Sequence, residues 1–161
     1  MKHILFVLVA FVTVATYGQD RKSPHETVNG DNISITYGRP YKKGREIFGK
    51  LEPYGKVWRI GADEATTITF KNDGTFGGKP VKAGTYTLFA IPDEKEWTFI
   101  LNSQLGQWGA YSYDKNKDKD VLQVKAPAKK LDKPVEQLTL SLPKSSLVME
   151  WDQTQVTVPV K

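Results

Sequence analysis

The sequence contains no cysteine and only two histidines, His3 and His25, among its 161 residues. Without cysteine the chain forms no disulfide and carries no lipid on a cysteine, so burial alone must stabilise the fold. The one histidine beyond the first residues is too few for the ligand sets that zinc and copper prefer. His25 also lies outside any nucleophile-elbow pattern, which argues against a serine triad. We therefore expect no metal and no cofactor.

Long hydrophobic runs are also scarce, and the one at the start of the chain spans only residues 4–15. It is short for a membrane span, but it follows Lys2 and precedes the small residues Thr16 and Gly18, as in a secretory signal. We interpret residues 1–18 as a cleavable signal peptide, with an uncleaved anchor as the alternative. Residues 19–161 then form a single domain. The mature protein is expected to be periplasmic or secreted, with no membrane span after signal removal.

Helical periodicity is nearly absent, whereas apolar and polar residues alternate at period two from Ile33 to the C-terminus. Such alternation is typical of strands with one face on a core. Turn residues at 72–74 predict one hairpin, and a second hairpin joins residues 85–91 to 97–101. The C-terminal third adds four predicted strands, at residues 121–126, 138–142, 147–151 and 156–160.

Residues 39–61 depart from this alternation, because glycine and proline interrupt the segment too often for a long helix or strand. At most one helical turn is expected there, around residues 46–48. Together these patterns predict an all-β domain, an antiparallel β-sandwich or barrel-like structure with one irregular Gly/Pro-rich loop segment.

Arginine is rare beside lysine, with 4 arginines and 19 lysines, yet Arg39, Arg45 and Arg59 all fall within or beside the irregular segment. Arginine differs from lysine in its planar, bidentate hydrogen bonding, so these positions suggest a need for that geometry. One interpretation is recognition of a carboxylate, phosphate or sugar. The alternative pairs the arginines internally with Glu46, Glu52, Asp63 or Glu64 to hold the loop. Because the net charge of +5 is spread along the chain, no nucleic-acid partner is expected.

Two tryptophans and one carboxylate complete the candidate ligand site. Trp58 and Trp108 could form an aromatic shelf, although large aromatic residues also dominate β-sandwich cores. Glu64, close in sequence to Arg59, is a candidate arginine partner or a lone general base. Four oxygen-bearing side chains, Asp114, Asn116, Asp118 and Asp120, alternate as in a calcium loop, but Lys119 and Lys125 replace the glycine and glutamate that such a loop needs.

The motifs of this chain resemble those of the DUF2911 family. They are Tyr37-Gly-Arg-Pro40, Gly44-Arg45-Glu-Ile-Phe-Gly49, Pro53-Tyr-Gly55, Trp58-Arg-Ile-Gly-Ala-Asp-Glu-Ala-Thr66 and Ala83-Gly-Thr-Tyr86. The resemblance covers nearly the whole mature chain. It implies a β-rich domain in a bacterial envelope setting and supplies no established catalytic residue.

These observations favour a periplasmic or secreted binding module for a polar or anionic small molecule or glycan. The candidate ligand-binding residues are Arg39, Arg45, Trp58, Arg59, Glu64 and Trp108. The first alternative is an envelope or extracellular hydrolase that uses Glu64 and Arg59. The second is a structural or protein-interaction domain, and the oligomeric state stays open.

Overall fold

The computed structural model describes residues 20–161, so the predicted signal peptide lies outside the described residues. Within them no helix is long and apolar enough to cross a membrane. The strands are β1 (His25–Asn29), β2 (Ile33–Gly38), β3 (Thr67–Phe70), β4 (Gly74–Phe76), β5 (Lys79–Val81), β6 (Gly84–Ile91), β7 (Glu96–Asn102), β8 (Asp120–Ser141) and β9 (Ser146–Pro159). A short helix α1 (Tyr113–Asn116) and a 3₁₀ turn, Lys117–Lys119, precede β8.

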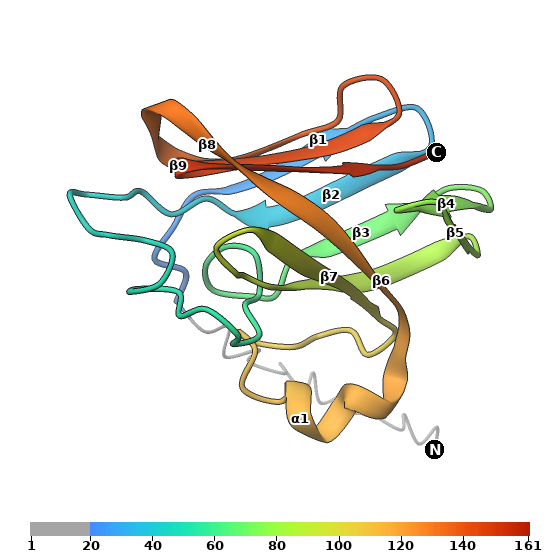
Figure 1. Ribbon diagram of the computed structural model, residues 1–161. Coiled ribbons are helices and arrows are strands. Elements are labelled where there is room, and N and C mark those ends of the chain that lie inside the picture. The colour runs from blue at the N-terminus through green and yellow to red at the C-terminus, as the bar shows by residue number, and fades with distance from the viewer. Residues whose placement is uncertain (1–19) are drawn as a thin grey trace, which may run out of the picture.

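Seven strands form one antiparallel sheet in the order β1-β2-β3-β6-β7-β8-β9, and β4 pairs separately with β5. The sheet curls into a half-barrel (Figure 1). The predicted hairpin between residues 85–91 and 97–101 is confirmed, because β6 and β7 pair from Thr87↔Asn102 to Ile91↔Thr98. The predicted all-β, barrel-like antiparallel domain is therefore confirmed.

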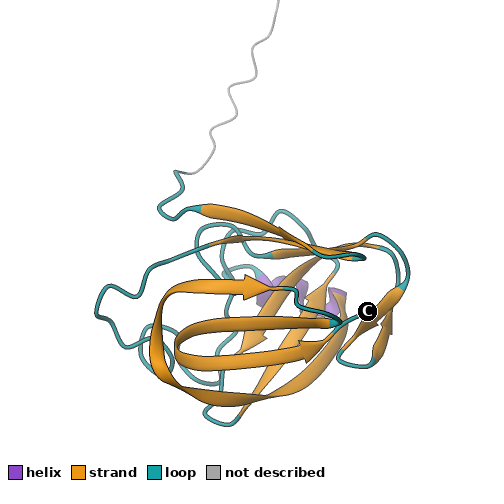
Figure 2. Cartoon of the chain, turned by 90° about the horizontal axis from the view of Figure 1, so that it is seen from above, coloured by secondary structure: helices purple, strands orange, loops and turns teal. Residues whose placement is uncertain are grey.

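The long hairpin of β8 and β9 bends over the open side of the half-barrel, as the view from above shows (Figure 2). Its pairing register shifts between Lys130 and Val135, where the two strands turn together. Beyond this bend, the backbone N–H of Leu140 donates to the hydroxyl of Tyr37 in β2, 2.9 Å away. The N–H of Leu138 donates to the carbonyl of Pro40. These contacts hold the distal half of the hairpin against the end of β2.

The main core fills the inside of the curled sheet. Alternating residues of β2, β3, β6, β7 and β9 point into it, and Trp97 and Trp151 are among its largest fully buried side chains. A smaller cluster, with Phe89, Ile100 and Tyr113, lies on the other face of β6 and β7, where the α1 segment covers the sheet. The period-two alternation of β6 and β7 is therefore lost, because both of their faces are covered.

Two sequence predictions need correction. Residues 72–74 do not join a hairpin of neighbouring strands, because β3 pairs with β2 and β6, while β4 pairs with β5 and bridges to Val160. The four predicted C-terminal strands are two long bent strands, because β8 and β9 stay paired through their common bend. Residues 46–48 form no helical turn, which agrees with the expectation of at most one, because the backbone there closes tight turns with residues 50–52.

Candidate functional site

The irregular segment is ordered by backbone contacts to the strands around it. Isolated bridges join Tyr41 to Gln137, Trp58 to Ala90 and Glu64 to Trp108. Between these anchors, Ile60 has φ +52° although it is β-branched and fully buried. That conformation is costly for an isoleucine, and such strain is concentrated at functional sites in proteins. The strained residue directly follows Arg59.

A cavity of about 450 Å³ opens between this segment and the N-terminal residues of the domain. We call it the arginine cavity, because Arg45 and Arg59 both line it, together with Glu52. Its remaining lining residues are Lys22, Ser23, Pro40, Tyr41, Lys43, Leu51, Gly61, Ala62, Asp63 and Trp151. Two of the predicted site residues, Arg45 and Arg59, are thus brought together.

Arg59 lines the cavity, and within residues 20–161 only the Nε of its guanidinium donates a hydrogen bond. Its Nε donates to the carbonyl of Gly61 at 3.1 Å, and none of the ion pairs formed within residues 20–161 includes Arg59. Gly109 makes room for it, since a Cβ there would lie 2.9 Å from Nη1 of Arg59. The guanidinium is therefore positioned from two sides and left open to a ligand.

Arg45 is held by its own loop. Its Nε donates to the carbonyl of Lys42 at 2.9 Å, and an Nη donates to the carbonyl of Tyr41. These bonds fix the direction of the side chain without neutralising its charge. The cavity is therefore lined by two arginines whose guanidinium groups are held in fixed positions.

Glu52 is the unusual acid of the cavity. Burial raises the pKa of Glu52 to about 7, although Arg59 and Arg45 act to lower it. The tight loop from Ile47 to Glu52 places it, with the N–H of Glu52 donating to the Ile47 carbonyl at 2.9 Å. Near neutral pH the side chain is then protonated about half of the time, which gives the cavity a proton donor and acceptor.

The rim of the arginine cavity is apolar and exposed. Tyr41 and Leu51 are 42% and 41% exposed, which is high for side chains of this size. Arg59 and Glu52 also line a neighbouring cavity of about 360 Å³, whose rim carries Tyr111 at 84% exposure. Exposed aromatic groups beside free arginines are typical of ligand-binding surfaces.

Arg39 and Trp58 do not line the arginine cavity, although Trp58 lines the neighbouring one. Arg39 donates to the carbonyl of Leu138 and to Oγ1 of Thr139, and it forms a 2.6 Å ion pair with Glu26. These bonds connect β1, the end of β2 and β8. Trp58 is 3% exposed and stacks on Trp151, with a ring centroid distance of 6.0 Å.

Glu64 and Trp108 lie apart from the arginine cavity. Glu64 pairs with Arg21 at 2.8 Å and with Nε2 of His25 at 3.0 Å, and the hydrogen bond from Arg21 lowers the pKa of Glu64. The expected contact with Arg59 is absent from the ion pairs described above. Trp108 is half-buried, and its main chain bridges to Glu64.

Sequence reasoning treated Glu52 only as one of several possible internal partners for the arginines. Its charge is ordinary in the sequence, and only the folded loop buries it beside Arg45 and Arg59. Exposed Tyr41 and Leu51 were equally inconspicuous, because each lies in the irregular segment where no alternation separates inner from outer faces. The cavity thus adds three residues, Tyr41, Leu51 and Glu52, to the predicted set.

Comparison with known proteins assigns the family. The family described as "Protein of unknown function (DUF2911)" matches residues 20–160, so the chain belongs to the DUF2911 family. This confirms the resemblance that the motifs suggested. Searches of curated proteins and of solved structures returned no match.

Proposed function

We propose that this member of the DUF2911 family is a periplasmic or secreted binding module that recognises a small carboxylate-bearing molecule, such as an organic acid or an acidic sugar, in the arginine cavity. The observation that carries the proposal is the free guanidinium of Arg59, which faces the same cavity as Arg45. Arginine forks bind carboxylates through paired, charge-assisted hydrogen bonds. A 450 Å³ space accommodates a ligand of this size.

The rest of the lining suits an acid with an organic body. Trp151 contributes an apolar wall, and Tyr41 and Leu51 offer apolar surface at the rim. The carbon skeleton of the ligand would cover these side chains while its carboxylate meets the arginines. Lys22 and Ser23 also line the cavity, and the lysine ammonium would donate to hydroxyl groups of the ligand while the serine hydroxyl would donate or accept.

Glu52 makes the proposed binding depend on pH. A ligand carboxylate beside an ionised Glu52 is repelled, whereas beside protonated Glu52 it can accept a hydrogen bond. Since the pKa of Glu52 is raised to about 7, the site takes up a proton at neutral pH when an anion binds. Affinity is therefore expected to increase as the pH falls through 7 and to level off below about pH 6.

A thermal-shift screen of organic acids, uronic acids and neutral sugars, followed by calorimetry, tests the proposal. The variant Arg59→Lys keeps the charge but loses the planar fork, so ligand affinity should fall about tenfold while the melting temperature stays near that of the wild type. The matched control is Arg39→Lys, which should lower stability and leave affinity unchanged. Equal affinity of wild type and Arg59→Lys for every acid that binds would contradict the proposal.

A second candidate function is hydrolysis, and the position of Glu52 favours it. Glu64 is a poor general base, because Arg21 pairs with it and the hydrogen bond from Arg21 lowers the pKa of Glu64. Glu52 faces Arg45 and Arg59 across one cavity, and a carboxyl with a pKa of about 7 is suited to general acid or base chemistry. Turnover of a screened glycan or peptide that is lost in Glu52→Gln but kept in Glu64→Gln would support this candidate over simple binding.

A further inference from the structure

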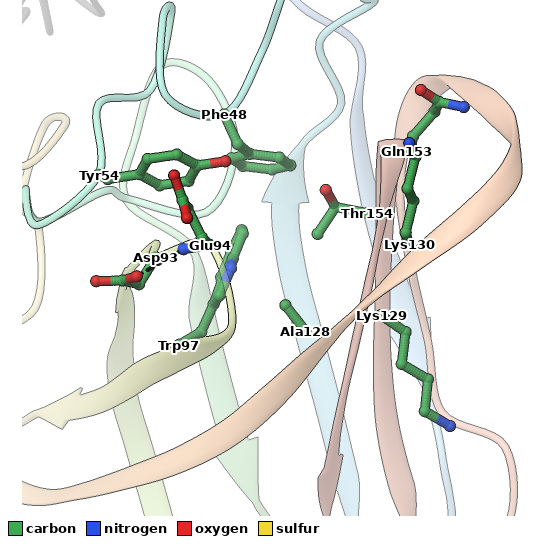
Figure 3. A pocket seen from close by; sticks show the side chains of 10 residues that line it. All are labelled: Phe48, Tyr54, Asp93, Glu94, Trp97, Ala128, Lys129, Lys130, Gln153 and Thr154. Carbon is green, nitrogen blue, oxygen red and sulfur yellow. Dashed lines mark hydrogen bonds between the residues drawn. The ribbon is translucent and has the colours of Figure 1, made fainter.

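A second cavity lies where the turn between β6 and β7 faces the bend of β8 and β9 (Figure 3). It encloses about 230 Å³, and we call it the corner cavity. Three aromatic side chains, Phe48, Tyr54 and Trp97, line it. Phe48 packs edge-on against Trp97, with ring centroids 4.6 Å apart, so these rings form a fixed wall.

Charges of opposite sign lie at the two ends of the corner cavity. In the β6–β7 turn, Glu94 points toward Tyr54 while Asp93 points away from the cavity. On β8, at the other side, Lys130 lies beside Gln153 and Lys129 extends away from the cavity (Figure 3). All four are exposed, and none of them takes part in an ion pair formed within residues 20–161. The cavity therefore has an acidic side and a basic side that do not neutralise each other.

The aromatic side chains reinforce this separation. Burial, Glu94 and Asp93 raise the pKa of Tyr54, which shows that the negative field of the turn reaches the tyrosine ring. Ring faces in a negative field attract ammonium groups through cation–π contacts. Trp97 is fully buried, and among the described residues its indole N–H has no hydrogen-bond acceptor.

We infer that the corner cavity binds a small zwitterion, a molecule of amino-acid size with an ammonium group at one end and a carboxylate at the other. The ammonium group lies against Glu94 and Tyr54, and the carboxylate meets Lys130. A simple anion would be repelled by the acidic turn, and a simple cation would be repelled by the lysines. Only a ligand with both charges satisfies both sides. This site is separate from the arginine cavity and does not depend on its ligand.

Titration with matched probes tests the ligand class. The zwitterions are 4-aminobutyrate and 6-aminohexanoate. The controls are hexylamine and hexanoate, each with one charge, which match the six-carbon chain of 6-aminohexanoate. Binding is followed by tryptophan fluorescence, because Trp97 lines the cavity, and by NMR. Exposed charge pairs are weak, so we expect dissociation constants of about 1 mM for a zwitterion and binding at least about fivefold weaker for the single ions. Absence of saturable zwitterion binding, or equal binding of the single ions, overturns the inference.

Charge-removing variants test the assigned positions. Glu94→Gln and Lys130→Gln should each weaken zwitterion binding about three- to fivefold. Glu94→Gln should also strengthen hexanoate binding, an effect that a loss of folding cannot produce. Lys82→Gln, in an exposed ion pair with Asp73 outside the cavity, is the control and should change nothing. Unchanged zwitterion affinity in both cavity variants would place the bound probe elsewhere and refute the site.

Discussion

Replacing Glu52 by glutamine should stabilise the protein at alkaline pH and leave it nearly unchanged at acidic pH. Burial raises the pKa of Glu52 from 4.5 to about 7, so the folded protein holds this proton over a pH range in which the unfolded chain has lost it. The folded state then binds more protons than the unfolded state, and the contribution of Glu52 to stability falls as the pH rises from 4.5 to about 7. Above about pH 7 the contribution of Glu52 to the free energy of unfolding has been lost and changes no further with pH.

The size of the effect follows from the same two values. A pKa raised from 4.5 to about 7 corresponds to at most about 3 kcal/mol of free energy of unfolding at pH 8. Glutamine has the shape of the protonated acid and no charge to bury. Glu52→Gln should therefore raise the free energy of unfolding by about 2 to 3 kcal/mol at pH 8 and by less than about 0.5 kcal/mol at pH 4.5.

Urea denaturation at both pH values measures this difference. Glu46→Gln, an exposed carboxylate of the same loop, is the matched control and should give the same small change at each pH. If Glu52→Gln alters the free energy of unfolding equally at pH 4.5 and pH 8, Glu52 is not buried as described, and the proton-linked binding proposed for the cavity loses its basis.

Three further predictions concern other parts of the chain. Arg39→Lys should lower the free energy of unfolding by about 2 kcal/mol in urea denaturation, because lysine cannot replace the guanidinium that donates to both Leu138 and Thr139. A variant as stable as the wild type would contradict the architectural role. Gly109→Ala should lower the free energy of unfolding by about 1 to 2 kcal/mol, because φ is +63° there. Calorimetry should also show weaker ligand binding, because the new Cβ displaces Arg59. Unchanged affinity would show that the guanidinium does not bind the ligand. Intact-mass analysis of protein from the native host should find a chain that starts at or near Gln19, and a chain starting at Met1 would disprove signal cleavage.

The strand pattern was predictable because burial of one sheet face leaves a period-two record in the sequence. The alternation of apolar and polar residues is lost near the bend of β8, where residues 129–136 are mostly exposed and Pro134 interrupts the pattern. Continuity through the bend depends on pairing with β9, which single-strand patterns do not report. Helix α1 has four residues, too few for helical periodicity to be recognised.

The candidate site was predictable only in part. The excess of arginine in the irregular segment singled out Arg45 and Arg59, which line one cavity, but it did not separate them from Arg39. The partners that make Arg39 architectural, Leu138 and Thr139, lie about one hundred residues away. The raised pKa of Glu52 likewise arises from burial in the folded loop, which leaves no mark on local sequence.

The most direct test of the proposed function is the affinity of the best-binding carboxylate at pH 6 and pH 8. A carboxylate keeps its charge over this range, whereas Glu52, with a pKa of about 7, changes from mostly protonated to mostly ionised. If the ligand binds only beside protonated Glu52, calorimetry on the wild type should give about tenfold tighter binding at pH 6 than at pH 8. Glu52→Gln should bind with equal affinity at both values. The same affinity at pH 6 and pH 8 in the wild type, or a pH dependence that persists in Glu52→Gln, would contradict the account.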